Sequence, residues 1–310
     1  MICVNWLPTN LALTADVARH AEQAGLWGIG VGDSPRYAEL FSACTFALES
    51  TNALRVTTCV TNPVTRHWSV HASAARGLLD SYGPRFRLGV GRGDSAVHSF
   101  GLPHAGLTDL AEFLAQIREA VAVPLLLASS GPRTAAIAGA RADGIIAGVG
   151  REPSQIAHIA SLANGARPAS SRALEVWATI RIAVTDDAEE TARVRRRRVP
   201  RAISASHFAF GSSFAGKGVP DRFLPVLKER YRRYDYRSHG SSGATSNATM
   251  FADRPDIEDY LLDRFAIVGT VEECREQLAQ VSTVADGVFL SILFEDAVAQ
   301  IDRIGEVVRG

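Results

Sequence analysis

Short apolar segments alternate with amphipathic, helix-like segments along most of the chain, and this alternation limits the possible folds more than any other feature. The strand-like runs are ICVNW, WGIGVGD, LRVTTCV, RFRLGVG, VPLLLA, DGIIAGV, ALEVWATIRIAVT and DGVFLSILF. Nearly continuous apolar strands separated by helices are typical of a parallel sheet that is buried on both faces. Eight such strands favour a closed α/β fold, the (β/α)8 TIM barrel, over an open doubly wound sheet.

A long segment after the seventh strand-like run breaks the alternation. From about residue 199 to 262 the pattern gives way to stretches rich in Gly, Ser and aromatic residues, such as HFAFGSSFAGKGVP. Long segments without a pattern are usually lids, binding loops or disordered chain. We predict a single barrel domain over residues 1–310 with an insertion at about 199–262, which either covers a substrate or is a passive loop.

Composition narrows the function classes. The 310 residues include 33 basic and 33 acidic side chains, and this balance argues against non-specific binding to nucleic acid or to an anionic membrane surface. The four cysteines form no C-x-x-C pair and indicate reduced thiols rather than a disulfide or zinc framework. No apolar run of about 18 residues and no signal peptide are present, so we expect a cytoplasmic protein without a membrane segment.

Two predicted strands carry glycine at every second position. These glycines are Gly28, Gly30 and Gly32 before Asp33, and Gly89, Gly91 and Gly93 in LGVGRGDSA. Glycine weakens a strand and often marks a close approach by another group. The approaching group is either a neighbouring part of the protein or a flat, rigid ligand at the strand ends. The spacing does not fit the dinucleotide-binding fingerprint.

Two further features have simple interpretations. His67 and His71 lie four residues apart at the start of a predicted helix, but no third ligand follows at a recognisable spacing, so we predict no metal site. The basic run ARVRRRRVPR follows the seventh strand. It is either a solvated helix face or a means of holding an anionic cofactor tail.

Several motifs together resemble a known family. TNPVTRH and GRGDSA follow the third and fourth strands, ASSGPRT precedes ADGIIAG, and FAIVGT lies near Phe265. The chain resembles the bacterial luciferase-like superfamily, in particular its methylenetetrahydromethanopterin-reductase-like branch of flavin- and deazaflavin-dependent oxidoreductases. The resemblance is dense from residue 28 to 150, returns from 265 to 305 and is poor in the insertion. It implies a barrel that holds a tricyclic flavin or deazaflavin at the carboxyl ends of its strands.

The segment SSGPRT opens a predicted helix directly after the fifth strand. Backbone N–H groups at a helix N-terminus favour an anion, although Ser130 alone is also a plausible helix cap. The resemblance assigns the cofactor phosphate to this helix start, to the end of the sixth strand and to an arginine after the fourth strand. The implied phosphate residues are Arg92, Ser129, Ser130, Gly131, Gly148 and Val149.

The resemblance also implies where the ring binds. Family members support the ring on a bulge after the third strand, often with a non-prolyl cis peptide, which corresponds here to Cys59–Val60. The implied ring contacts are Asp33, Cys59, Val60, Thr61 and Asn62, and we expect Trp6 and Tyr37 beside the substrate.

Asp33 and His67 are the candidate catalytic residues. Asp33 ends the second strand, where many relatives continue with histidine but this chain continues with Ser34. A buried carboxyl near an apolar ring is able to donate a proton. The alternative is that Asp33 only hydrogen-bonds the cofactor or caps a turn.

These features predict an oxidoreductase that uses reduced coenzyme F-420, a deazaflavin, to transfer hydride to a C=N or C=C bond, or that runs in reverse on an alcohol. The alternatives are an FMN-dependent monooxygenase that activates O2 and a non-catalytic flavin-binding protein. We expect a small-molecule substrate, a partner reductase that supplies reduced cofactor, and a homodimer.

Overall fold

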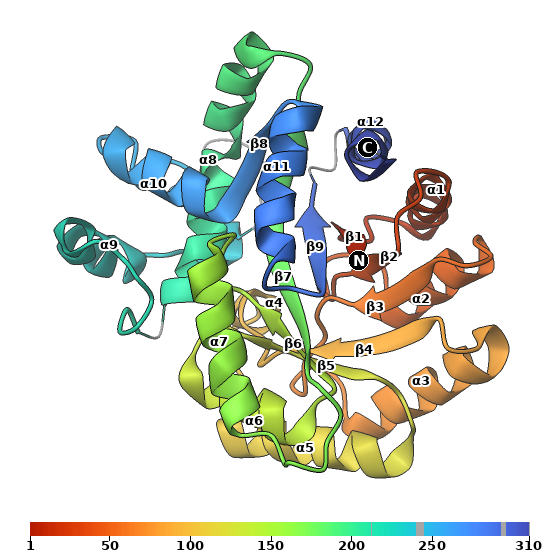
Figure 1. Ribbon diagram of the computed structural model, residues 1–310. Coiled ribbons are helices and arrows are strands. Elements are labelled where there is room, and N and C mark those ends of the chain that lie inside the picture. Colours follow the sequence, from red (N-terminus) through yellow and green to blue (C-terminus); the bar gives the residue numbers. More distant parts are fainter. Residues whose placement is uncertain (212, 240–244, 293–295, 310) are drawn as a thin grey trace.

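The computed structural model describes residues 1–211, 213–239, 245–292 and 296–309. Within these residues, eight parallel strands close a barrel in the order β6-β5-β4-β3-β2-β1-β9-β7, with β7 also paired to β6 (Figure 1). The barrel strands are β1 (Ile2–Trp6), β2 (Gly28–Val31), β3 (Arg55–Thr58), β4 (Phe86–Val90), β5 (Leu125–Ser129), β6 (Gly144–Ala147), β7 (Glu175–Val184) and β9 (Gly287–Ser291). The predicted (β/α)8 barrel is confirmed.

Helices cover the outside of the barrel because each presents a buried apolar stripe to the sheet. They are α1 (Leu11–Gln23), α2 (Leu40–Glu49), α3 (Trp68–Tyr82), α5 (Leu107–Ala120), α6 (Pro132–Arg141), α7 (Pro153–Gly165), α11 (Val271–Ser282) and α12 (Ala297–Arg309). The short helix α4 (Ser95–His98) follows β4 at the mouth of the barrel. None of the helices within the described ranges is long and apolar enough to cross a membrane.

One strand was not predicted. β8 (Ala266–Gly269) pairs only with the last part of β7, where Arg181 lies opposite Ala266 and Val184 opposite Gly269. β7 has ten residues, so its first part pairs with β6 and β9 in the barrel and its last part extends beyond them. The strand predicted to be the eighth, DGVFLSILF, contains β9, which closes the barrel. Residues 293–294 of that segment lie outside the described residues.

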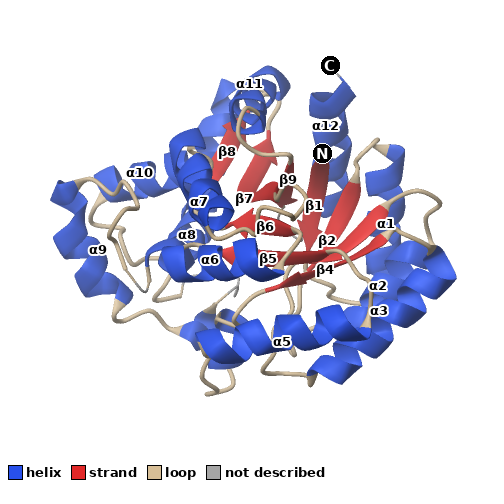
Figure 2. Ribbon diagram, turned by 60° about the horizontal axis from the view of Figure 1, so that its bottom comes forward, coloured by secondary structure: helices blue, strands red, loops and turns tan. Residues whose placement is uncertain are grey.

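The predicted insertion falls in the connection between β7 and β8 and is mostly helical. It contains α8 (Ala188–Phe210), η1 (Asp221–Phe223), α9 (Leu224–Tyr231), η2 (Tyr236–Ser238) and α10 (Pro255–Phe265). Residues 212 and 240–244 of the predicted insertion lie outside the described residues. The insertion lies to one side of the barrel and has its own apolar core, including Phe210, Phe223 and Phe251 (Figure 2).

The interior of the barrel is filled near the amino ends of the strands. Trp177 and Phe289 contact each other with ring centroids 4.9 Å apart, and together with Cys3, Leu126 and Ile146 they form a fully buried cluster. This cluster closes the bottom of the barrel, so an internal cavity can only lie toward the carboxyl ends of the strands, where TIM-barrel enzymes place their active sites.

Candidate active site

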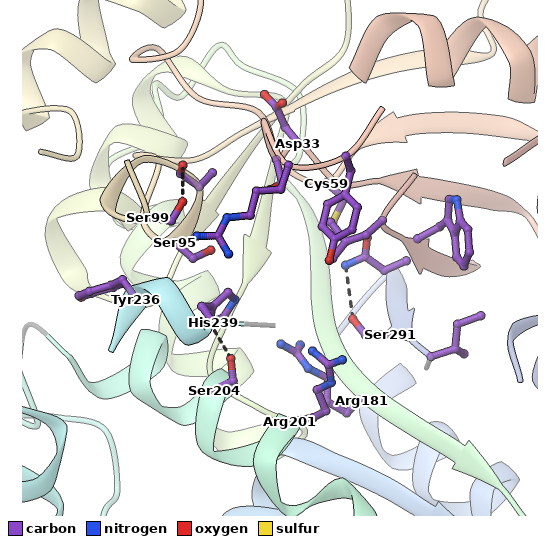
Figure 3. Close-up of a pocket in the computed structure, with 18 of the residues that line it drawn as sticks. Asp33, Cys59, Ser95, Ser99, Arg181, Arg201, Ser204, Tyr236, His239 and Ser291 are labelled. Carbon is purple, nitrogen blue, oxygen red and sulfur yellow. Dashed lines mark hydrogen bonds between the residues drawn. The ribbon is translucent and has the colours of Figure 1, made fainter. Parts of the chain in front are cut away.

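A cavity of about 240 Å³, which we call the mouth cavity, lies at the carboxyl ends of the barrel strands (Figure 3). Its barrel wall is formed by side chains at or after β1, β2, β3, β7 and β9, namely Trp6, Asp33, Cys59, Arg181 and Ser291. Its volume is below the roughly 300–1,000 Å³ of sites that enclose a drug-sized ligand. The mouth cavity therefore suits a small substrate better than a large one.

The opposite wall, which we call the insertion wall, comes from the insertion. α8 contributes Arg201 and Ser204, and the segment around η2 contributes Tyr236 and His239 (Figure 3). Tyr236 also contacts His98 of α4, with ring centroids 4.5 Å apart. Of the two alternatives for the insertion, the structure therefore favours a covering element over a passive loop.

The chain forms a bulge after β3, as the family resemblance implied. The peptide bond between Cys59 and Val60 is cis, which confirms that prediction. Thr61 then pairs with β4 again, because its N–H donates to Gly89 O at 3.0 Å and its carbonyl accepts from Gly91 N at 2.7 Å. Cys59 lines the mouth cavity, and burial raises the pKa of its thiol to about 12. It therefore presents a neutral, apolar side chain.

The alternating glycines make room for this bulge. A Cβ atom on Gly89 would overlap the carbonyl oxygen of Thr58, and one on Gly91 would lie 2.8 Å from Val60 Cγ2. On the neighbouring strand β2, a Cβ atom on Gly30 would lie 2.9 Å from Cys59 Cβ. Of the two alternatives for the approaching group, the structure supports a neighbouring part of the protein.

Asp33 connects the end of β2 to the bulge. Its Oδ2 accepts hydrogen bonds from Thr61 Oγ1 at 2.7 Å and from Arg66 Nη1 at 2.7 Å. The Asp33 side chain is 3% exposed and that of Arg66 is 20% exposed, so this ion pair is largely shielded from water. The carboxylate is held in one orientation at the rim of the mouth cavity, and Oδ2 acts as a hydrogen-bond acceptor. This geometry suits a group that accepts a proton or binds a ligand better than one that donates a proton.

The structure places the second candidate catalytic residue elsewhere. His67 is the N-cap of α3, where its exposed ring bonds with Ser69 through Nδ1 and Oγ at 2.8 Å. It does not line the mouth cavity. We expected His67 to be catalytic, but its position indicates a capping role. Helix α3 begins at the next residue and needs an acceptor for its first N–H groups.

Two other predicted residues have contrasting positions. Asn62 is buried, and its Oδ1 accepts from Val64 N at 3.0 Å and from Thr65 N at 2.9 Å, so its carbonyl serves a local turn. Tyr37 lines the mouth cavity.

The predicted phosphate residues form a separate group at the ends of β5 and β6. Two of the serine hydroxyls have internal partners: Ser129 Oγ bonds with Thr134 Oγ1 at 2.7 Å and Ser130 Oγ donates to Phe208 O at 3.3 Å. Gly148 N donates to Ser129 O at 2.9 Å, which joins the two strand ends. Ser130 therefore fastens the insertion to the barrel instead of capping α6.

The start of α6 nevertheless fits an incoming anion. In the described part of the chain no side chain caps this helix, whose N-cap is Gly131. A Cβ atom on Gly131 would have no described atom within 4 Å, so there is open space beside the first N–H groups. Helix N-termini of this kind bind phosphate. The backbone donors fit the predicted role, whereas the hydroxyls do not.

The last two predicted phosphate residues are held by backbone contacts. Arg92 Nε donates to Ala105 O at 2.8 Å, and Val149 O accepts from Arg264 Nε at 3.3 Å. Neither residue lines the mouth cavity.

The arginines of the mouth cavity were not predicted as site residues. Arg198 and Arg201 belong to the basic run, which therefore divides into a solvated part and a part that faces the cavity. Arg181 reaches the cavity from β7. A sequence signal for it existed: Arg181 lies four residues after Trp177, and alternate residues of a strand share one face. It therefore points into the barrel interior, as Trp177 does.

His239, in the insertion wall, is a neutral, hydrogen-bonded histidine. Burial lowers the pKa of His239 to about 3, and the charges of Arg181 and Arg201 lower it further in the same direction. His239 Nδ1 lies 2.7 Å from Tyr234 Oη and 3.0 Å from Ser204 Oγ, so the neutral ring is hydrogen-bonded to hydroxyl groups through this nitrogen. Across residues 1–211, 213–239, 245–292 and 296–309, no group of three or more His, Cys, Asp or Glu residues is arranged to hold a metal.

Comparisons with known proteins identify the family of the chain. Residues 7–123 and 118–287 match the model of a protein family described as luciferase-like monooxygenase. Over 303 residues, the chain is 24% identical to a 5,10-methylenetetrahydromethanopterin reductase of Methanolobus tindarius, covering 89% of this chain and 88% of that protein.

Two solved structures show the same fold. A coenzyme F-420-dependent tetrahydromethanopterin reductase from Methanopyrus kandleri superposes with a TM-score of 0.74 at 17% identity, covering 99% of this chain and 98% of that chain. An F-420-dependent secondary alcohol dehydrogenase, solved with an F-420–acetone adduct, superposes with a TM-score of 0.71 at 18% identity and covers 100% of this chain and 98% of its own.

Proposed function

The chain belongs to the luciferase-like monooxygenase family and is an oxidoreductase, and on this premise we propose that it transfers a hydride between coenzyme F-420 and a small organic substrate in the mouth cavity. The reaction would reduce a C=N or C=C bond, or oxidise an alcohol in reverse. The reductase and dehydrogenase relatives carry F-420 in their names and superpose over nearly the whole chain, which supports the deazaflavin over FMN. The single observation that carries the proposal is the bulge after β3, whose Cys59 side chain lines the mouth cavity.

Two separate parts of the chain would hold the cofactor. The ring would lie against the neutral Cys59 side chain and the bulge, and an anionic group of its tail would bind the N-terminus of α6 at Gly131. When bound, the reduced cofactor supplies a hydride, which is two electrons and one proton, to a substrate carbon.

The protein supplies position and a proton-transfer group. Asp33, ion-paired with Arg66, is the group we propose to accept a proton from an alcohol, or to return one to the neighbouring substrate atom in reduction. Trp6 and Tyr37 border the substrate, and Tyr236 and His239 of the insertion wall cover it. Holding substrate and cofactor in a fixed geometry is a large part of what such an enzyme contributes.

An FMN-dependent monooxygenase is the second candidate, because the matching family model carries that activity in its description. Reduced FMN would then be supplied by a partner reductase. For either cofactor we also propose a cytoplasmic homodimer that acts on a small molecule and binds neither nucleic acid nor membrane.

A substitution at the start of α6 tests the cofactor assignment. Gly131→Asp places a carboxylate where the phosphate is proposed to bind, and Asp is a favourable N-cap residue. The backbone at Gly131 is extended (φ −152°), which any residue can adopt. We expect an unchanged or higher Tm and an F-420 affinity at least about 10-fold lower, since an aspartate cap and a bound phosphate exclude each other. Gly131→Asn is the matched neutral control and should retain more affinity.

Titration of the wild type with F-420 and FMN decides between the two cofactors. We expect saturable F-420 binding and much weaker FMN binding. Tight FMN binding together with substrate-dependent oxygen uptake would instead establish the monooxygenase, and unchanged F-420 affinity in Gly131→Asp would remove the phosphate assignment.

A further inference from the structure

Arg181 is a charged side chain inside the barrel for which the proposed reaction gives no role. It lies on β7 opposite Ser291 of β9 and Ala266 of β8, and it shares the interior face of the strand with Trp177. Its guanidinium makes no hydrogen bond and no ion pair with any residue in the described part of the chain. Arg181 is half-buried, and an unpaired charge that is withdrawn from water is costly unless a counter-charge joins it.

The surroundings of Arg181 add positive charge. Arg201 lies beside it at the lower side of the mouth cavity in Figure 3, and both side chains extend toward the cavity. Burial lowers the pKa of Arg181 to about 10, and the charge of Arg201 acts in the same direction. At neutral pH the guanidinium is still charged, so the protein maintains two neighbouring cations on this side of the cavity.

The acidic residue of the lining does not compensate for Arg181. Asp33 is the acidic residue among the described residues that line the cavity, and its carboxylate is ion-paired with Arg66 at 2.7 Å. In Figure 3 Asp33 lies on the opposite side of the cavity from Arg181. Among the described residues Arg181 therefore has no counter-charge, and an incoming anion would supply one.

The anion is better explained as part of the substrate than as the cofactor tail. The start of α6, where the tail fits, follows β5 and does not line the mouth cavity. Arg181 instead faces the cavity that Cys59 of the bulge borders, and it influences the pKa of the Cys59 thiol through its charge. An anion bound to Arg181 would therefore lie close to the ring, where the reacting part of the substrate must be.

From the position of Arg181 and its lack of a counter-charge among the described residues, we infer that the substrate is an organic anion whose carboxylate binds Arg181 inside the mouth cavity. A planar guanidinium matches a carboxylate through two parallel hydrogen bonds, which fixes orientation as well as position. This inference rests on the proposed function for the identity of the second reactant, but the anion site itself does not.

Fluorinated carboxylates provide probes for an unidentified substrate. Difluoroacetate, 4-fluorophenylacetate and 4-fluorobenzoate, each paired with its amide, are titrated into the full chain at pH 7.5 with and without F-420, and binding is followed by 19F NMR. At least one acid should bind saturably and at least about 10-fold more tightly than its amide, since hydrogen bonds between charged partners are the stronger ones. Equal binding of acids and amides, or no binding by any acid, would overturn the inference.

Three variants locate the site. Arg181→Met should weaken binding of the acid at least about 10-fold without changing F-420 affinity. The affinity of Arg181→Lys for the acid should lie between those of Arg181→Met and the wild type. Arg196→Met removes an exposed arginine of α8 and serves as the control for net charge; acid binding should not change. The Tm of Arg181→Met should be equal to or higher than that of the wild type, because a half-buried charge without a partner among the described residues is removed. A lower Tm with unchanged acid binding would make Arg181 a structural residue and contradict the inference.

The outcomes separate this inference from the proposed function. Arg181-dependent acid binding in a protein that binds neither F-420 nor FMN would support the anion site and refute the function. Normal F-420 binding, together with acid binding that does not change in Arg181→Met, would support the proposed function and refute the anion site. A loss of F-420 affinity in Arg181→Met, with acid binding retained, would assign Arg181 to the cofactor and overturn the inference.

Discussion

Two regions of the barrel wall differ in how their charged groups are satisfied. At the end of β2, the Asp33 carboxylate bonds with Thr61 and Arg66, so its charge is neutralised. On β7, the Arg181 guanidinium lines the mouth cavity without a hydrogen-bond or ion-pair partner among the described residues. Under the proposed function, the first region supports the cofactor and the second binds the substrate.

The largest effect is expected where the barrel wall is tightest. Gly89→Ala would drive a Cβ atom into the Thr58 carbonyl, and overpacking against backbone should cost about 3 kcal/mol of unfolding free energy. Chemical denaturation measures this loss. Gly131→Ala, which has open space, is the matched control and should change stability by less than about 1 kcal/mol. Similar losses in both variants would show that the barrel wall is not specially rigid.

The second-largest effect is expected for proton transfer by Asp33 of the barrel wall. Asp33→Asn should slow turnover about 100-fold, because the amide cannot accept a proton. Single-turnover kinetics with preloaded cofactor separate this step from binding. Glu39→Gln alters the other carboxylate that Arg66 contacts, at 3.2 Å, and should change the rate far less. Equal rates in the wild type and Asp33→Asn would remove the proposed role of Asp33.

A pH titration tests the insertion. Burial lowers the pKa of His207 to about 4 from 6.5, and the ring stacks on Tyr234 with centroids 3.8 Å apart. The pKa of His207 is lower in the folded state than in the unfolded state. The neutral ring therefore stabilises the fold fully above pH 6.5, and this stability is lost as the pH falls toward 4. His207→Phe should therefore lessen the acid sensitivity of unfolding by about 1 kcal/mol at pH 5.5. If the free energy of unfolding depends on pH in the same way in the wild type and in His207→Phe, His207 is not buried in a neutral state.

The smallest effect is expected at a residue outside both walls. His67→Ala removes a weak cap of α3, with Ser69 N at 3.4 Å from Nδ1, and should cost about 0.5 kcal/mol. Turnover should be unchanged. A large loss of activity with normal stability would restore the original expectation that His67 is catalytic.

The elements that follow from local sequence pattern could be predicted, whereas those that depend on distant contacts could not. Barrel strands follow from local apolar patterning, and the cis peptide at Cys59–Val60 followed from a motif shared with the family. β8 was missed because four residues, AIVG, pair with a part of β7 that extends past the barrel, which local patterning does not reveal.

The insertion was harder to predict because its structure depends on distant contacts. Its helices form a core of their own, with residues such as Phe210 and Phe251 far apart in sequence. Arg181 was overlooked because WATIRIAVT was interpreted only as a strand, although the residue parity places the arginine inside the barrel. His67 was chosen from its residue type, and its capping role depends on where α3 begins.

A crystal structure of the protein with bound F-420 would show where each part of the cofactor lies. We expect the ring against Cys59–Thr61 at the mouth cavity, an anionic group of the tail at the first N–H groups of α6, and Arg181 accessible to a second ligand. A ring bound elsewhere, or a cofactor anion bound to Arg181, would refute the separation of the cofactor site from the substrate site.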